Sequence, residues 1–373
     1  MKKTTVLCYA GIVVLVVSVI GLGFANGNAS QPANAAPNGV PSELAPSVLP
    51  SLGIPAVTPT LSVQGSSGLF TFTAIDVGRG DALLLSWPDL SGRTRYMLVD
   101  GGTADDWPYV HAYLASHGVM YLDAIVCTHE HDDHLNGLIE LLKSGDIGVG
   151  AAYDAGFLVC QKGWPEYPKI QEYLALLEKQ NIPRQIVGAG DELYTANPAV
   201  TIRVLNPDPQ HLIITPRKND TQNANSVALE VTYNQARFLL MGDTLTSSYW
   251  QMMKEGYIEQ ADVLKLSHHG DMPANSPIYK EFLTIVHPKY AIATCGCYRP
   301  DYASGWMCQM SSVPKVLAGV SVYRSACSGD ITITTNGKTS ANGVSYTVTT
   351  TQNLPPGACI AECKSTCTAD DTD

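Results

Sequence analysis

Residues 129–134 read His-Glu-His-Asp-Asp-His and directly follow a largely apolar stretch, 122–128. An apolar stretch of this length predicts a buried strand, so the run places three imidazoles and a spaced carboxylate at the end of that strand. Such a set of nitrogen and oxygen ligands suits zinc or a similar divalent ion. A polar loop with chance histidines is the alternative. It fits poorly, because the 373 residues contain only nine histidines.

Three other apolar stretches also end in an acid or an imidazole. They are followed by Asp100, by Asp243 and by the pair His268-His269. A carboxylate at a strand end can accept the ring N–H of a ligating histidine, which is the role we expect for Asp100. A carboxylate also offers two oxygens, so Asp243 can bridge two cations. Each motif alone is compatible with an ordinary turn, but together they predict a convergent site.

Between residues 70 and 350, predicted strands and helices alternate. Apolar patterns predict strands at 70–77, 82–87, 96–99, 201–205, 227–233, 237–241, 262–266, 330–335 and 344–350, and helices at 107–117, 135–143, 165–180 and 247–255. Asn336-Gly337 predicts a hairpin-like ending between the last two strands. Mixed strands with interspersed helices, in two similar halves, predict an α+β fold of two stacked sheets with helices outside.

The N-terminal 68 residues differ in composition from the rest. Lys2 and Lys3 precede an apolar run from residue 6 to residue 25, which predicts that residues 1–25 are a signal peptide or a retained membrane anchor. Residues 26–68 are rich in Asn, Ala, Pro and Ser with one charge, Glu43, and predict a linker. We therefore expect an extracellular domain at 69–352, either secreted or anchored at the outer face of the cytoplasmic membrane, and a polar Cys-rich tail at 353–373.

The charge balance argues against nonspecific binding to polyanions. The chain carries 34 acidic and 23 basic residues, a formal net charge of −11. This balance opposes attraction to nucleic acid or anionic lipid in the absence of a local basic patch, and the sequence contains no Lys- or Arg-rich run. We expect membrane contact only through an uncleaved N-terminal segment, and no protein partner can be inferred.

Cysteine usage agrees with export. Cys127 lies in the apolar strand before the histidine run and is expected to be a buried free thiol. The other eight cysteines outside the leader are Cys160, Cys295, Cys297, Cys308, Cys327, Cys359, Cys363 and Cys367. They could form four disulfides in an oxidising compartment, with a connectivity that the sequence leaves open. A metal cluster at 359–367 is the less favoured alternative.

In the order of these motifs, the chain resembles the metallo-β-lactamase superfamily, whose fold is a four-layer αββα sandwich with a one- or two-metal site. The finer similarity is to the extracellular hydrolase domain of the ComEC/Rec2-like competence proteins. It is carried by residues 76–82, 225–229, 239–243, 264–270 and 329–333. The long multispan channel of full competence proteins is absent, so the chain resembles a stand-alone domain.

The resemblance implies roles for individual residues. One metal would be held by His129 and His131, the other by Asp133, His134 and His268, with Asp243 between them. The ions would be zinc or manganese. Asp100 would orient a ligand, and Asp81 would belong to a loop beside the site. The residues implied in catalysis are Asp133, Asp100 and His269, the last as a proton donor or a contact for a substrate oxyanion.

The chain departs from the superfamily at one point. Most members supply another histidine before the bridging Asp, but residues 219–226 contain none. Asp220 or Asn225 could contribute an oxygen instead, which would weaken the preference for zinc and favour manganese. The first metal site therefore has the less completely assigned ligand set.

The implied mechanism uses a hydroxide held between two cations ~3.5–4 Å apart. Phosphodiesters are the expected substrate class, with nucleic acid among them, because the competence branch is linked to DNA-strand degradation. Hydrolysis of β-lactams or of other esters and amides is the alternative reaction. A surface binding module with a weakened site is the alternative of another class.

Overall fold

The structure is a computed structural model that describes residues 68–78, 80–157, 165–271, 275–295 and 317–353. The predicted leader, the linker up to residue 67 and the tail beyond residue 353 lie outside these described residues. Six of the cysteines expected in disulfides also lie outside them, so their pairing stays a prediction. Within the described ranges, no helix is long and apolar enough to cross a bilayer.

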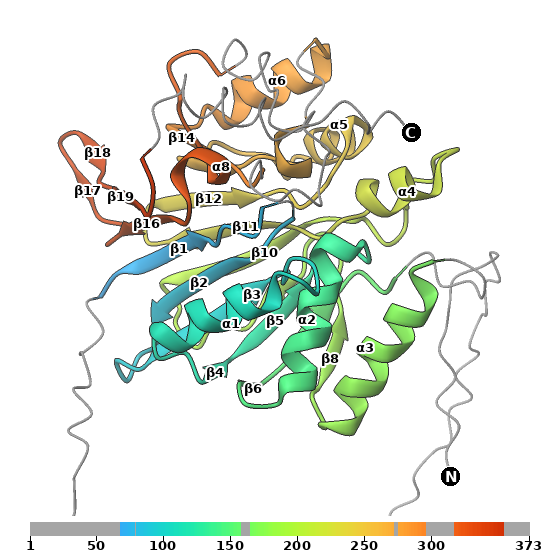
Figure 1. The fold of residues 1–373 in the computed structure, drawn as a ribbon. Coiled ribbons are helices and arrows are strands. Elements are labelled where there is room, and N and C mark those ends of the chain that lie inside the picture. Colours follow the sequence, from blue (N-terminus) through green and yellow to red (C-terminus); the bar gives the residue numbers. More distant parts are fainter. Residues whose placement is uncertain (1–67, 79, 158–164, 272–274, 296–316, 354–373) are drawn as a thin grey trace, which may run out of the picture. The chain divides into compact units, whose positions relative to one another are not determined.

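The first sheet has eight strands in the order β19-β16-β1-β2-β3-β5-β7-β8 (Figure 1). Their bounds are β1 (Phe70–Ala74), β2 (Leu83–Pro88), β3 (Thr94–Val99), β5 (Ala124–Cys127), β7 (Ala152–Asp154), β8 (Arg184–Ile186), β16 (Ile331–Thr335) and β19 (Thr347–Thr350). Strands β19 through β3 pair antiparallel, and β3, β5, β7 and β8 are parallel. The parallel strands therefore end at one edge of the sheet.

The second sheet has seven strands in the order β15-β14-β13-β12-β11-β10-β9. Their bounds are β9 (Glu192–Leu193), β10 (Val200–Asn206), β11 (Ala228–Tyr233), β12 (Ala236–Leu240), β13 (Val263–Lys265), β14 (Tyr290–Ala293) and β15 (Ser321–Arg324). Strands β12 to β15 are parallel. Two small ribbons complete the described strands: β4 (Tyr121–Leu122) with β6 (Gly148–Val149), and β17 (Thr339–Ser340) with β18 (Gly343–Val344).

Helices cover the outer face of each sheet, as Figure 1 shows. On the first sheet lie α1 (Trp107–Ser116), α2 (Asp132–Ser144) and α3 (Tyr167–Lys179), and on the second lie α5 (Thr246–Lys254) and α6 (Pro277–Val286). The shorter helices are α4 (Lys218–Ala224), η1 (His268–Gly270) and α8 (Ser325–Ser328). The predicted four-layer αββα sandwich is confirmed.

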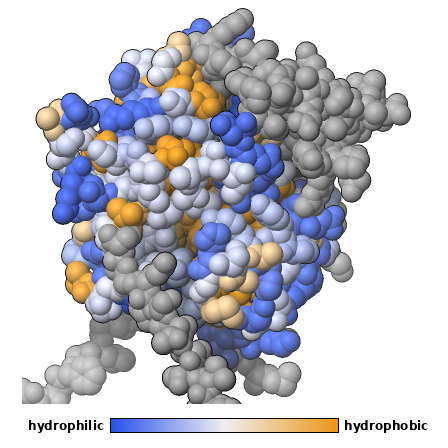
Figure 2. All heavy atoms as spheres, turned by 60° about the vertical axis from the view of Figure 1, so that its left-hand side comes forward, coloured by the Kyte–Doolittle hydropathy of each residue, from blue (hydrophilic) through white to orange (hydrophobic). Residues whose placement is uncertain are grey.

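Side-chain alternation along the strands builds the layers. In β2, Leu83 and Leu85 point into the core between the sheets, whereas Leu84 packs under the helices. Both faces of the strand are apolar because both are covered. The core between the sheets includes Phe70 and Phe238, whose ring centroids lie 5.0 Å apart. On the face shown in Figure 2, hydrophobic residues gather only in small groups among polar ones.

The expected hairpin-like ending is present, but Asn336-Gly337 does not form a tight turn between its two strands. β16 does pair antiparallel with β19, but the chain makes the β17–β18 ribbon before it returns. The Asn336-Gly337 turn packs instead on the turn between β11 and β12. There Asn234 Nδ2 donates to the Asn336 carbonyl at 3.0 Å, and the Gln235 N–H donates to the Gly337 carbonyl at 2.9 Å. A tertiary contact thus overrides the local hairpin signal.

Helix α2 approaches the loop after β3 so closely that only glycine fits. A Cβ on Gly137 would lie 1.8 Å from the Gly101 carbonyl oxygen. The Gly101 N–H donates to the His134 carbonyl at 2.9 Å. This contact fixes the helix against the strand end that carries Asp100.

Gly137→Ala is therefore expected to lower the free energy of unfolding by about 1–3 kcal/mol, because the added methyl must push the helix away. Helix propensity alone has the opposite sign, favouring alanine by ~1 kcal/mol. Urea unfolding measures the change. The control is Asn136→Ala on the same helix, expected within about 0.5 kcal/mol of the wild type. A Gly137→Ala protein as stable as the wild type would contradict the close approach.

Candidate metal centre

Ends of strands from both sheets meet at one place. Asp100 follows β3, and residues 128–134 follow β5. Asp243 follows β12, and His268 and His269 follow β13. The structure therefore brings together the strand ends that the sequence singled out, and β5, β12 and β13 deliver imidazoles or carboxylates to a common centre.

His134 is held by a network at the end of β3. Its Nδ1–H donates to Asp100 Oδ2 at 2.8 Å. The Thr128 hydroxyl donates to the same oxygen at 2.7 Å, and the Thr128 N–H donates to Asp100 Oδ1 at 2.8 Å. Asp100 and His134 are fully buried. Because the ring donates to Asp100 through Nδ1, Nε2 of His134 points away from Asp100, to the position that a cation can take.

His269 is held in a matching way from the second sheet. Its Nδ1 lies 3.2 Å from Thr294 Oγ1 and 3.3 Å from Asp81 Oδ1. The Thr294 hydroxyl donates to Asp81 at 2.5 Å, so its oxygen can accept from the ring N–H. The Lys265 ammonium, also fully buried, contacts Asp81 Oδ2 at 2.6 Å. Asp81 was expected only to shape a loop, and Lys265 was not predicted at all.

His129 and His131 form the other half of the site. His129 Nε2 lies 3.0 Å from His131 Nδ1. Their outer nitrogens have partners of their own, since His129 Nδ1 lies 3.1 Å from the Thr128 hydroxyl and His131 Nε2 lies 2.8 Å from Gln222 Oε1. The amide oxygen of Gln222 can only accept, so His131 carries its proton on Nε2. The inner nitrogens are thereby left as two facing lone pairs.

Electrostatics keep these two rings neutral. Burial lowers the pKa of His129 well below its usual value, and the neighbouring imidazoles His134 and His131 lower it further. Burial also lowers the pKa of His131. Neutral imidazoles are the form that binds metal ions.

Asp243 lies at the centre of the cluster. Its Oδ2 is 3.7 Å from His129 Nε2, 3.3 Å from His134 Nε2 and 3.5 Å from His269 Nε2. The buried atoms His134 Nε2, His269 Nε2 and Asp243 Oδ1 have no hydrogen-bond partner. Buried polar atoms are rarely left without a partner. Unpartnered nitrogen and oxygen atoms that converge in this way fit a cation in contact with Asp243.

Asp133 completes the second ligand set. Its Oδ2 lies 3.4 Å from His269 Nε2, and its Oδ1 lies 3.8 Å from His134 Nε2. The Gly80 backbone lies so close that a Cβ there would be 2.4 Å from the Asp133 carbonyl oxygen. The loop between β1 and β2, which carries Gly80 and Asp81, thus packs against the start of α2 and lies beside the site, as the resemblance implied.

The structure places the two neighbouring histidines differently from their implied roles. His269 is fully buried and belongs to the groups that could hold a cation with Asp133, His134 and Asp243. The His268 side chain is 22% exposed, and its Nε2 lies 3.9 Å from Asp243. Both residues have positive φ, 47° and 54°, and this turn after β13 directs His269 inward. The geometry therefore favours His269 as the ligand and His268 at the margin.

The segment without the expected histidine also differs from expectation. The side-chain amide of Asn225 is engaged by backbone groups. Its Oδ1 accepts from the Ile213 N–H at 3.0 Å, and its Nδ2 donates to the carbonyls of Ile213 and Thr221, both at 2.7 Å. The Asp220 side chain is 39% exposed and lies 4.0 Å from Arg217. Asn225 therefore cannot supply a ligand oxygen.

Cys127 is a buried thiol, as predicted. Its Sγ–H donates to the His129 carbonyl at 3.1 Å. Burial raises its pKa well above the usual value, so it remains a neutral thiol. Its hydrogen bond supports the backbone of residues 128–134, which carry the candidate ligands.

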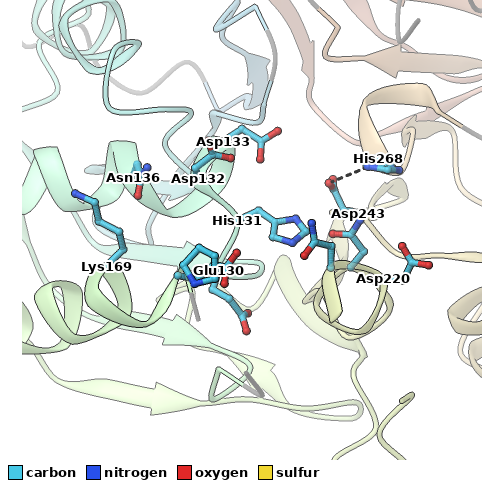
Figure 3. Close-up of a pocket in the computed structure, with 13 residues that line it drawn as sticks. Glu130, His131, Asp132, Asp133, Asn136, Lys169, Asp220, Asp243 and His268 are labelled. Carbon is cyan, nitrogen blue, oxygen red and sulfur yellow. Dashed lines mark ion pairs between the residues drawn. The ribbon is translucent and has the colours of Figure 1, made fainter. Parts of the chain in front are cut away.

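A cavity of about 570 Å³ opens onto these residues. Figure 3 shows His131 near its middle, Lys169 of α3 on one side and Asp220 of α4 on the other, with the Asp243–His268 pair on the wall. A cavity of this size admits a small molecule or part of a larger one.

With this geometry established, comparison with known proteins identifies the family. The model of the metallo-β-lactamase superfamily matches residues 76–277, more than half of the 373-residue chain. The chain belongs to the metallo-β-lactamase superfamily. It is accordingly a metal-dependent hydrolase by family, and its His and Asp groups fit the divalent ions that the superfamily uses.

Several individual proteins are similar to parts of this chain. ComE operon protein 3 of Bacillus subtilis (strain 168) is 27% identical over 240 residues, or 60% of this chain, and the chain spans 28% of that relative's length. The metallo hydrolase Igni18 from Ignicoccus hospitalis is similar at 13% identity and a TM-score of 0.41, covering 71% of this chain and 98% of its own. A metal-dependent hydrolase of the β-lactamase superfamily is similar at 11% identity and a TM-score of 0.43, covering 68% and 95%.

The surroundings of the site also keep protons on two ligands until a cation arrives. Burial lowers the pKa of His134, but the carboxylates of Asp243, Asp100 and Asp133 raise it well above its usual value of 6.5. Burial likewise lowers the pKa of His269, but nearby carboxylates, above all Asp243, raise it well above its usual value. The raised pKa values favour the protonated rings in the metal-free protein, so a cation competes with protons for these two ligands.

Addition of zinc to the metal-free protein at pH 7 is accordingly expected to release protons. Because the raised pKa values favour the protonated rings at low pH, the apparent metal affinity is expected to rise as the pH increases from about 6 to 8. Calorimetry in two buffers of different ionisation enthalpy measures the protons released. Equal heats in both buffers would contradict the protonated state of His134 and His269.

The buried Lys265–Asp81 pair gives a stability prediction. Lys265→Met is expected to lower the free energy of unfolding by about 3–5 kcal/mol, because it leaves Asp81 buried without its cation. Adding Asp81→Asn to that variant is expected to recover part of the loss. Urea unfolding of the two single variants and the double variant gives the coupling. Additive effects would show that the pair does not stabilise the fold as a unit.

Proposed function

We propose that this protein hydrolyses phosphodiesters with two divalent cations, zinc or manganese. The observation that carries the proposal is the position of Asp243, whose Oδ2 lies within 3.7 Å of imidazole nitrogens from both ligand sets. One set is His129 and His131, and the other is Asp133, His134 and His269. A carboxylate between two sets is the arrangement of paired-metal hydrolases of phosphate esters.

When bound, the cations would polarise the phosphoryl group, activate water and stabilise negative charge on the attacked group. The protein's own residues fix the ligands and shape the cavity. Asp100 and Asp81 hold the rings of His134 and His269 in one tautomer each. His268, at the cavity wall and partly exposed, is within reach of substrate and donates a proton to the leaving oxygen.

The charge of the cavity bears on the kind of phosphodiester. Its described lining includes the acidic residues Glu130, Asp132, Asp133, Glu166, Asp220 and Asp243, and one lysine, Lys169. Lys169 is itself paired with Glu172 at 3.3 Å. Carboxylates around the mouth repel a polyanion. DNA and related phosphodiesters remain the proposed class, and this lining favours a short or single-stranded substrate over a long duplex.

The site of action is part of the proposal. The basic residues Lys2 and Lys3 and the apolar run after them support export, with the hydrolase domain outside the cytoplasmic membrane. The relative named as ComE operon protein 3 supports a link to competence. Substrates available outside the cell are therefore the relevant ones.

A substrate panel tests the reaction. The purified full chain, stripped with a chelator and reloaded with Mn²⁺ or Zn²⁺, is expected to cleave bis-p-nitrophenyl phosphate and single-stranded DNA, and to be inactive before reloading. Asp243→Asn is expected to lower the rate at least ~100-fold, because even the partners of metal ligands typically contribute 10–100-fold.

Asp146→Asn is the matched control, because this exposed carboxylate pairs with His111 away from the cavity. It is expected to retain the wild-type rate. A chromogenic cephalosporin completes the panel. Cleavage of the cephalosporin without cleavage of any phosphodiester would contradict the proposal and support the β-lactamase-like alternative. No turnover by a fully loaded protein would favour a binding module.

A further inference from the structure

The His129–His131 half of the site has fewer ligands than the other half. Besides the shared Asp243, this half contains two described ligands, the imidazoles of His129 and His131. The other half contains three, Asp133, His134 and His269. A zinc ion generally takes four ligands. Residues 212–242 contain no histidine to fill the gap. His211, just before them, has a 71% exposed side chain that pairs with Asp208 at 2.5 Å.

Asn223, in helix α4, has an unused buried oxygen. The residue is 4% exposed, and its Oδ1 is buried without a hydrogen-bond partner. It lines the same cavity as His131 and Asp243. Leaving a buried amide oxygen without a partner typically costs about 1–3 kcal/mol. Because Asn223 lines the cavity that holds the candidate ligands, its unsatisfied oxygen indicates a missing partner, either a cation or a donor bound to one.

The neighbours of Asn223 are already committed to other contacts. Gln222 Oε1 accepts from His131 Nε2 at 2.8 Å. The Ala224 carbonyl accepts from Ser248 Oγ at 2.7 Å and from Asn206 Nδ2 at 3.1 Å. These bonds hold the C-terminal end of α4 against the site and leave Asn223 as the residue of this turn whose oxygen is not used.

We propose that Asn223 Oδ1 is the protein ligand that takes the place of the absent histidine at the first cation. An amide oxygen is a neutral, hard ligand, which suits manganese or magnesium better than an imidazole does and binds zinc less tightly. The two sites are then unequal. The set of Asp133, His134, His269 and Asp243 fills first, and the set of His129, His131, Asp243 and Asn223 fills second with lower affinity.

Metal titration tests this assignment without any substrate. The metal-free full chain is titrated with Zn²⁺ and with Mn²⁺ by calorimetry, and bound metal is measured after equilibrium dialysis. The wild type is expected to bind two ions in two resolved steps. Asn223→Ala is expected to weaken the second step at least ~10-fold and to leave the first unchanged. Asn223→His is expected to strengthen the second step for Zn²⁺ at least ~10-fold.

Asn219→Ala is the matched control, because Asn219 lies on the same helix and lines the same cavity but is exposed. It is expected to leave both steps unchanged. The retained first step serves as the internal check on folding of Asn223→Ala. If that variant does not fold, Asn223→His decides, and an unchanged zinc affinity there overturns the assignment. Two unchanged steps in Asn223→Ala also overturn it.

The inference rests on the proposed two-cation site but not on its substrate. A protein that binds two ions with the expected variant effects yet cleaves no phosphodiester keeps Asn223 as a ligand and loses the proposed reaction. A wild type that cleaves phosphodiesters while binding a single ion keeps the reaction and loses the assignment of Asn223.

Discussion

Asp243 must remain charged while it is 1% exposed, and the site is organised around that requirement. Burial raises the pKa of its carboxyl, but the imidazoles of His269 and His134 hold it well below the usual value. A buried carboxylate without such compensation costs several kcal/mol. Positive charge must therefore stand beside Asp243 in every state of the folded protein, as protons on the rings or as cations in their place.

Two carboxylates from loops of the first sheet hold the two histidines in the same way. At His134, Thr128 and the imidazole ring donate to Asp100. At His269, Thr294 donates to Asp81 while the ring lies against both. Each carboxylate holds one ring at Nδ1 and thereby presents Nε2 to the centre. The two arrangements differ in Lys265, which neutralises Asp81, so only one of these two carboxylates has a permanent cation.

Much of this could be predicted from sequence, because strand ends are local features. The apolar runs before Asp100, His129 and Asp243 determine both the sheets and the convergence of their ends. The sequence could not show which of His268 and His269 is the ligand. That depends on the positive φ angles of both residues, which no sequence pattern predicts. Lys265 reads as an ordinary strand residue, and Gln222 lies outside every helix and strand that the sequence predicts. The fold shows that they contact Asp81 and His131, at sequence separations of 184 and 91 residues.

The distance along the chain between the candidate ligands has a consequence for how the protein acquires its metal. The ligands at 129–134 and those at 243 and 269 come from opposite halves of the chain, so a cation cannot be fully coordinated before both sheets have folded against each other. Full coordination is therefore possible only after the sheets have packed, and an ion held by His134 and Asp243 would close a chain loop of more than 100 residues. The ion that the site contains then reflects the metals available where folding is completed, because availability and geometry, rather than affinity alone, select metals in cells.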